Sequence, residues 1–197
     1  MDDYYNLGDY TRAITAAHPD ASLWFSRGLV WCYGFHHEEA LRCFANGLAA
    51  DPDCCMNHWG IAYATGPNYN KDWDAFGEDE MAAALDDVRA ALAEAQRCAA
   101  NATDLEVDLT RALVAQFPAD RTEQATGHDR YADAMRAVYA RHTGDPDVAA
   151  LFAEALMIRT PWALWDLASG SPAAGTDTEE ARQVLEAAMT NEGGTGH

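Results

Sequence analysis

The sequence has little positive charge. Its 197 residues include 13 Lys and Arg against 32 Asp and Glu, which gives a formal net charge of −19 at pH 7. A surface with this balance repels phosphate backbones and anionic lipid. Since no basic cluster interrupts the acidic character, we expect no nucleic acid among its partners.

Long apolar runs and a secretion signal are also missing. No run approaches the roughly 20 apolar residues of a membrane-spanning helix. The first residues, MDDYYNLGDY, lack a basic stretch followed by an apolar one. An odd number of cysteines, five, does not suggest a disulfide framework. We therefore expect a cytoplasmic protein with reduced thiols that contacts no membrane.

The common nucleotide and hydrolase motifs are absent from the sequence. It contains no G-x-x-x-x-G-K-[ST], G-x-G-x-x-G, H-E-x-x-H or G-x-S-x-G. Nucleotide-dependent and ordinary hydrolase functions are therefore unsupported, and a site without a known motif stays open.

Helical patterns fill most of the chain, and convincing alternating strands are absent. Ala, Leu, Glu and Arg dominate, with apolar residues at helical spacing. We expect helices at 20–34, 37–50, 53–65, 77–100, 103–117, 121–142, 146–158 and 177–190. Thr176 and Glu179 form a possible capping box for the last helix. Two prolines limit residues 159–176 to a loop with one short helical turn.

Residues 24–52 carry a spaced pattern of large and small side chains. Six positions define it: Trp24, Gly28, Trp31, Ala40, Phe44 and Pro52. Their spacing is that of the tetratricopeptide repeat. Gly28 and Ala40 are small where the two helices of a hairpin would cross, and Phe44 would fill the gap between neighbouring hairpins. The pattern predicts an all-α fold, a TPR-like array of antiparallel helical hairpins that forms an irregular α-solenoid.

This fold predicts three segments along the chain. Residues 1–19 form an extended or capping N-terminal segment, because Pro19 comes too early to close another repeat. Residues 20–192 form the TPR-like helical domain. Residues 193–197 form a flexible Gly-rich tail.

Three longer stretches carry a wider resemblance: WCYGFHHEEALRCF, DPDCCMNHWGIAYATGPNYN and AEALMIRTPWALWD. Over about 24–166 the chain resembles a family of bacterial tetratricopeptide-repeat proteins. The resemblance implies a helical-repeat fold, and a His-rich second half that begins near His197 in a longer polypeptide. It implies no reaction, since the family's activity is mostly unassigned. His36 and Cys55 depart from the family pattern, and both add possible metal-ligand atoms.

Stacked hairpins create a concave surface lined by the first helix of each pair. An aromatic groove of this kind suits a peptide, a protein partner or a small ligand. Alternatively, an N-terminal segment or a partner subunit fills it. The residues expected to line or rim the groove are Phe25, Leu29, Cys32, Tyr33, His36, Met56, Trp59, Tyr63, Asn68 and Asn70.

Cysteine and histidine also recur at helical spacing. Cys54 with His58, and Cys32 with His36, are each four residues apart, so each pair would share one helix face. Such donors suit Cu(I) or Zn(II). The predicted metal ligands are His36, His37, Cys54 and His58, although cysteine is also a common core residue.

Two other side chains raise a separate question. Glu154 and Arg159 flank ALMIRTPW, and a carboxylate in an apolar helix is costly unless it is paired. We expect an ion pair between them within the fold.

Two functions compete at this point. The leading one is a helical-repeat binding module with a peptide, a partner or a small ligand in its groove. The alternative is a metal-binding protein or a metal-dependent oxidoreductase using Cu, Zn or Fe, with further ligands from a second half or another chain. The sequence assigns no reaction and no catalytic residue. A third possibility is that the groove and the end faces are buried in an oligomer.

Overall fold

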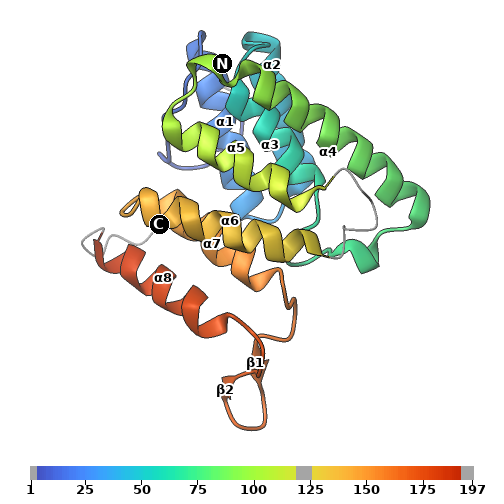
Figure 1. Cartoon of the computed structure of the whole chain (residues 1–197). Coiled ribbons are helices and arrows are strands. Elements are labelled where there is room, and N and C mark those ends of the chain that lie inside the picture. The colour runs from blue at the N-terminus through green and yellow to red at the C-terminus, as the bar shows by residue number, and fades with distance from the viewer. Residues whose placement is uncertain (1–3, 119–125, 192–197) are drawn as a thin grey trace. The chain divides into compact units, whose positions relative to one another are not determined.

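The protein is mostly helical in a computed structural model that describes residues 4–118 and 126–191 (Figure 1). Two 3-10 turns, Trp73–Ala75 and Ala99–Asn101, and a hairpin of two short strands accompany the helices. The eight α-helices of these residues are α1 (Pro19–Tyr33), α2 (His37–Ala50), α3 (Cys55–Thr65), α4 (Glu78–Cys98), α5 (Asp104–Gln116), α6 (Gly127–Arg141), α7 (Pro146–Met157) and α8 (Thr178–Asn191). The prediction of a helical fold is confirmed.

None of the described helices is both long and apolar enough to cross a membrane. Each of the five cysteines, all of which lie in the described residues, is a thiol outside any disulfide.

Prolines and capping side chains set two helix starts. His18 caps α1, because its Nδ1 accepts the backbone N–H of Asp20 at 3.2 Å, and Pro19 takes the first helical position. Asp145 caps α7 by accepting the N–H of Val148 at 3.0 Å, and a proline follows it as well. A proline at this position loses nothing, since the first N–H groups of a helix have no partner inside it.

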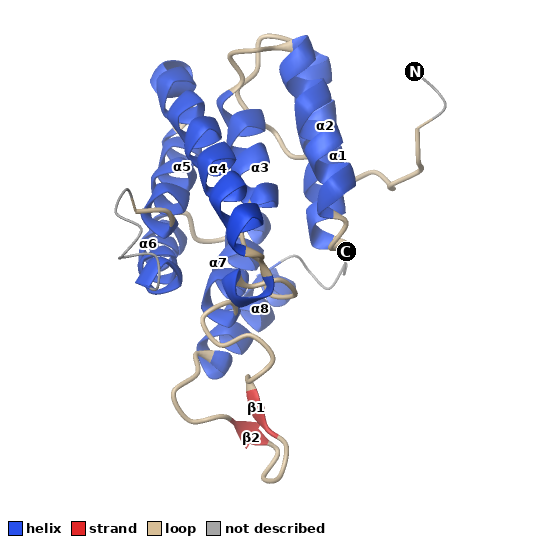
Figure 2. Ribbon diagram, turned by 90° about the vertical axis from the view of Figure 1, so that its right-hand side faces the viewer, coloured by secondary structure: helices blue, strands red, loops and turns tan. Residues whose placement is uncertain are grey.

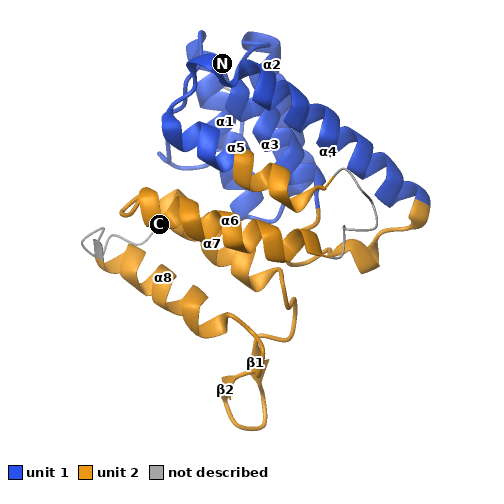
Figure 3. Ribbon diagram, viewed as in Figure 1, with its two compact units in different colours: residues 1–66, 79–110 blue, residues 67–78, 111–197 orange. Residues whose placement is uncertain are grey.

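The chain divides into two compact units (Figure 3). Unit 1 consists of residues 1–66 and 79–110, and unit 2 of residues 67–78 and 111–197. The single helical domain over 20–192 stays a prediction from the sequence. The predicted tail at 193–197 lies outside the described residues.

In unit 1, α1 and α2 form a helical hairpin. Only residues 34–36 connect them, and the two helices contact each other along their length (Figure 2). Phe35 in this connection adopts a left-handed backbone, with φ 58°. α3 follows and packs against both helices of the hairpin.

The ring of Phe44 fills a slot between two glycines. A Cβ added to Gly28 of α1 would lie 2.4 Å from Cε1 of Phe44, and one added to Gly60 of α3 would lie 2.6 Å from its Cδ1. Phe44 itself is fully buried. A Cβ added to Gly47 of α2 would likewise lie 2.4 Å from Oδ1 of Asn57. The close packing of α1, α2 and α3 therefore depends on positions that have no side chain.

The N-terminal segment at residues 4–18 contains no helix and is held to unit 1 by buried carboxylates. Glu106 accepts the backbone N–H of Thr15 at 2.6 Å and its hydroxyl at 2.7 Å. Asp51 accepts the N–H of Ala17 at 2.6 Å. These bonds satisfy both carboxylates, which are otherwise costly to bury.

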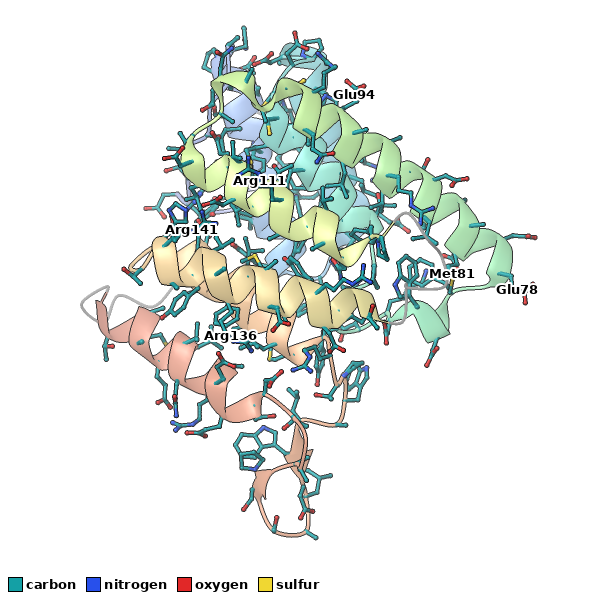
Figure 4. The ribbon with its side chains drawn as sticks, viewed as in Figure 1. Glu78, Met81, Glu94, Arg111, Arg136 and Arg141 are labelled. Atoms are coloured by element: carbon teal, nitrogen blue, oxygen red, sulfur yellow. The ribbon has the colours of Figure 1, made fainter. Side chains whose placement is uncertain are left out.

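In unit 2, α7 packs between α6 and α8. The rings of Tyr139 and Phe152 stack with their centroids 5.3 Å apart. Arg136 of α6 (Figure 4) reaches Glu180 of α8 with two parallel hydrogen bonds of 2.9 and 3.0 Å. A two-pronged arginine–carboxylate pair of this kind fixes the orientation of both side chains.

The segment predicted as a loop with a helical turn contains a small hairpin instead. Strands β1 (Trp165–Asp166) and β2 (Ser171–Pro172) pair antiparallel. Asp166 accepts the N–H of Ala168 and the hydroxyl of Ser169, at 3.0 and 2.7 Å. This local bonding favours a turn over a helix at 166–170.

The capping box predicted at Thr176 is also wrong. The hydroxyl of Thr176 donates to the carbonyl oxygen of Ala173 at 2.8 Å, and α8 begins two residues later at Thr178. The N–H of Ala181 bonds to the carbonyl oxygen of Asp177, so the chain enters the helix at Asp177.

The ion pair expected between Glu154 and Arg159 does not form. Arg159 pairs with Asp129 at 2.7 Å and with Asp177. Glu154 on α7 makes no ion pair with any described residue, and burial raises its pKa to about 8. This carboxyl group therefore carries a proton over most of the neutral range.

Gly28→Ala should destabilise the protein by about 1–3 kcal/mol, because the added methyl group overlaps the ring of Phe44. Chemical denaturation measures the change. Gly34→Ala is the matched control, since the nearest atom to an added Cβ there is 3.5 Å away. Equal stability of both variants would contradict the close packing of Phe44 against Gly28.

Glu154→Gln should stabilise the protein at about pH 9 by on the order of 4 kcal/mol more than at about pH 5. The folded state holds the Glu154 proton up to about pH 8, whereas the unfolded chain releases it near its ordinary pKa of 4.5. Wild-type stability is therefore lost as pH rises through this window, and the glutamine variant avoids the loss. Thermal melts across the pH range measure it, and a difference that does not depend on pH would contradict the burial of this group.

Candidate metal centre

Three side chains of unit 1 bring different metal-ligand atoms together. Single ligand atoms of His58, Glu94 and Cys98 all lie within 4.8 Å of one another. Glu94, which Figure 4 shows near the C-terminal end of α4, lies four residues before Cys98, so the two share a helix face. His58 is the fourth residue of α3. The group thus joins two consecutive α-helices, α3 and α4.

The ring of His58 has a defined hydrogen-bond partner. Its Nε2 lies 2.9 Å from the carbonyl oxygen of Pro52. A carbonyl oxygen only accepts, so Nε2 carries the hydrogen and Nδ1 keeps a lone pair. Histidines that bind metal commonly donate their other N–H to a backbone carbonyl in this way. The hydrogen bond therefore leaves Nδ1 as the ring nitrogen with a lone pair for a metal.

Cys98 supplies a protonated thiol. Its Sγ lies 3.6 Å from Oδ1 of Asp53, to which it donates. Burial raises the pKa of the thiol, and the neighbouring Arg97 guanidinium opposes part of this effect. The side chain is partly exposed, so an ion has access to it. A metal bound here would displace the thiol proton.

A second carboxylate and an arginine adjoin the group. Arg97 donates from Nε to Glu94 Oε2 at 2.7 Å and from Nη2 to Asp53 Oδ1 at 2.9 Å. The hydrogen bond from Arg97, followed by the one from Cys98, lowers the pKa of Asp53. Asp53 belongs to the connection between α2 and α3, so this connection is tied to α4.

The donor set defines the kind of ion that fits. An imidazole nitrogen, a cysteine sulfur and a carboxylate oxygen are each ligand types that Zn(II) takes in proteins. Calcium and magnesium prefer oxygen ligands alone, and Cu(I) prefers sulfur over carboxylate. The arrangement therefore favours Zn(II) over Cu(I), calcium and magnesium.

Of the four predicted metal ligands, only His58 belongs to this group. Cys54 precedes the first residue of α3, with ψ 103°, so it does not share a helix face with His58. Its Sγ accepts from the side-chain amide of Asn57 at 3.2 Å. The expected pairing of Cys54 with His58 fails because the helix starts one residue too late.

The same reason separates His36 from Cys32. α1 ends at Tyr33, so His36 lies beyond the helix and instead caps α2, where its Nδ1 accepts the N–H of Glu39 at 3.3 Å. His37 is the first residue of α2, and burial lowers its pKa. The structure does not bring these two histidines into the metal-ligand group.

Half of the predicted groove belongs to the core of unit 1. Five of the ten side chains are at most 5% exposed: Phe25, Leu29, Cys32, Met56 and Trp59. Trp59 donates from Nε1 to the carbonyl oxygen of Leu109 at 3.3 Å, within unit 1. These residues therefore do not line an open surface in this structure.

The other five groove residues are less buried but are not gathered in one unit. Tyr33, His36 and Tyr63 keep part of their surface exposed, and the ring of Tyr63 stacks on Trp59. Asn68 and Asn70 belong to unit 2, where Asn68 pairs with Lys71 in a tight turn.

The N-terminal segment occupies one face of α1. The hydroxyl of Tyr4 accepts from Trp31 Nε1 at 2.8 Å and donates to Glu39 at 2.9 Å. Its ring meets Trp24 edge-on, and the guanidinium of Arg27 lies 4.5 Å from its centroid. These contacts are with residues outside the predicted groove, so the alternative in which an N-terminal segment fills that groove stays a prediction.

Asp53, Glu94, Arg97 and Cys98 were not among the residues predicted from the sequence to form a site. The spacing of Glu94 and Cys98 within the expected helix 77–100 was a usable signal. Their meeting with His58 depends on tertiary packing, which no local pattern records.

Comparison with protein-family models, with curated proteins and with solved structures found no match. The resemblance to bacterial tetratricopeptide-repeat proteins stays a prediction from the sequence. Function therefore has to be argued from the geometry of the site.

Trp59→Ala should cost about 3–5 kcal/mol of stability, because it removes a buried ring that packs against Phe25. Tyr63→Ala serves as the partly exposed comparison and should cost less. Denaturant titration with a folded-state probe measures both variants. A stable Trp59→Ala protein would restore Trp59 as a candidate groove residue.

Proposed function

We propose that the protein binds one transition-metal ion, Zn(II) by preference, through His58, Glu94 and Cys98 of unit 1. The observation that carries this proposal is the convergence of three ligand atoms from α3 and α4 within 4.8 Å. It keeps the metal-binding alternative of the sequence analysis with a different set of ligands. We assign no redox step, because Zn(II) has a single stable oxidation state in proteins.

Two features support metal binding over a chance meeting of polar groups. The hydrogen bond from His58 to Pro52 orients the ring and fixes its tautomer. The group also combines nitrogen, sulfur and oxygen donors, beyond the carboxylate–arginine pair of Glu94 and Arg97 that is usual on a solvated helix face. Together they describe a site rather than a charge pattern.

The wild-type protein should bind one equivalent of Co(II) or Zn(II), and Co(II) should show a thiolate-to-metal band in the near ultraviolet. Cys98→Ser should remove the band, and His58→Ala should weaken affinity at least about 100-fold, since each variant deletes a direct ligand. Competition titration against a chromophoric chelator measures affinity.

Glu78→Ala is the matched control for Glu94→Ala. Glu78 is an exposed glutamate at the start of the same helix, sixteen residues or about 24 Å from Glu94 (Figure 4). It should leave affinity unchanged, whereas Glu94→Ala should reduce it. A wild-type protein that takes up no metal under reducing conditions would end the proposal.

A second candidate function is the helical-repeat binding module. The α1–α2 hairpin, with Phe44 against Gly28, has the packing that a tetratricopeptide repeat requires, and this supports a TPR-like arrangement. Since half of the expected groove residues are core and the others are spread over both units, we propose that partner contact lies elsewhere, at residues 162–167 of unit 2.

This segment exposes large apolar side chains on a defined backbone. Trp162 is 74% exposed, Trp165 is 45% exposed and Leu167 is 93% exposed. Trp162 has φ 63°, which is uncommon for a bulky residue, and its N–H donates to the hydroxyl of Tyr69 at 3.1 Å. Clustered exposed tryptophan is typical of contact sites in protein interfaces.

A photo-crosslinking amino acid at position 167 should give a discrete adduct in cells, and Trp162→Ala should abolish it without changing the melting temperature. The same amino acid at exposed position 78 controls for random collisions. An adduct that survives Trp162→Ala would contradict a role for this segment.

A further inference from the structure

Two carboxylates at the candidate metal centre share a single arginine. Arg97 spans them, with Nε at 2.7 Å from Glu94 and Nη2 at 2.9 Å from Asp53. Without a cation, the two negative charges would repel each other. Arg97 therefore occupies the electrostatic position that a bound metal ion would take.

Asp53 lies outside the group of three ligand atoms, and to join it the exposed carboxylate has to move toward the ion, but it already approaches one member of the group, Cys98. Its Oδ1 is 3.6 Å from Cys98 Sγ. Zinc bonds of about 2.3 Å to sulfur and about 2.1 Å to oxygen, at a tetrahedral angle, separate the two ligand atoms by about 3.6 Å. The observed separation is thus the one that two ligands of a single zinc ion would have.

The backbone holds Asp53 beside the other ligand from this region. The carbonyl oxygen of Pro52, the preceding residue, accepts from His58 at 2.9 Å. The N–H of Asp53 bonds to the side chain of Asp51 at 3.3 Å. Movement of His58 and of Asp53 is therefore coupled through one peptide unit.

The bonds that Arg97 makes are exposed to solvent. The side chains of Arg97 and Asp53 are 56% and 75% exposed, and that of Glu94 is 48% exposed. Exposed ion pairs of this kind contribute little to stability and are screened by salt. A divalent ion held by a thiolate and an imidazole would displace them.

On the basis of the proposed metal binding, we infer that Asp53 is the fourth ligand and that Arg97 is a resident counter-ion that the metal displaces. Binding exchanges the Arg97 hydrogen bonds for bonds from Asp53 and Glu94 to the ion, and the Cys98 proton leaves to solvent. His58, Asp53, Glu94 and Cys98 then complete a closed tetrahedral site. Such a site joins the α2–α3 connection, α3 and α4, and it leaves no position open for a substrate.

The variant Asp53→Cys tests the fourth ligand, because a second thiolate bound to Co(II) would increase the absorbance. If position 53 reaches the ion, this variant should bind Co(II) with about twice the thiolate-to-cobalt absorbance of the wild type, in reducing buffer. Asp53→Ala should weaken Zn(II) affinity at least tenfold. Asp79→Ala, at an exposed aspartate on α4, should change neither quantity.

Arg97→Met tests the counter-ion. It removes the positive charge and keeps an unbranched side chain, so Zn(II) should bind severalfold more tightly than to the wild type. The gain should shrink at high salt, since screening reduces the effect of the lost charge.

The outcomes separate this inference from the proposed function. A wild-type protein that binds no metal would end both. A wild-type protein that binds metal, with an unchanged cobalt band in Asp53→Cys and full affinity in Asp53→Ala, would overturn the fourth ligand alone. Weaker binding by Arg97→Met would overturn its role as a displaced counter-ion.

Discussion

The packing of α1, α2 and α3 in unit 1 depends on the space between two glycines that receives the ring of Phe44. Its ring lies against Gly28 of α1 and Gly60 of α3, at distances that leave no room for a side chain on either glycine. One aromatic ring on α2 therefore sets the separation of three helices, because a packed interior transmits even the volume of a methyl group. His58 lies two residues before Gly60 on α3. The position of this candidate ligand thus depends on core packing, although the side chain itself reaches the surface.

The short connection between α2 and α3 links this core to the polar cluster. Asp51 at its start is buried and holds the N-terminal segment through Ala17. Asp53, two residues later, is exposed and meets Arg97 of α4. Within this short connection, the buried carboxylate of Asp51 stabilises the fold, and the exposed carboxylate of Asp53 adjoins the candidate metal ligands. The same local charges favour a divalent cation, since Arg97 neutralises only one of the two carboxylates beside it.

Sequence patterns predicted helices well where residues such as proline mark the start of a helix. α7 begins at Pro146 as expected, α1 begins at Pro19, one residue before its predicted start, and α2 has the predicted bounds, His37–Ala50. The patterns failed where the exact end of a helix decides which metal-ligand side chains share a face. A shift of one to three residues at the start of α3 and the end of α1 removed both predicted cysteine–histidine pairs, because four-residue spacing brings side chains together only inside a helix. The groove failed for a different reason, since large apolar rings are equally suited to a surface that binds a partner and to a core.

The sequence by itself determined the helical class, the acidic surface and the short hairpin of α1 and α2, because these follow from composition, spacing and local turn chemistry. Tertiary structure alone decided which polar groups meet. Glu94 and Cys98 are neighbours on one helix by spacing, but their approach to His58 joins residues about forty positions apart and depends on side-chain packing between helices. Long-range contacts of this kind are set by how volumes fill the core, and no local pattern encodes them.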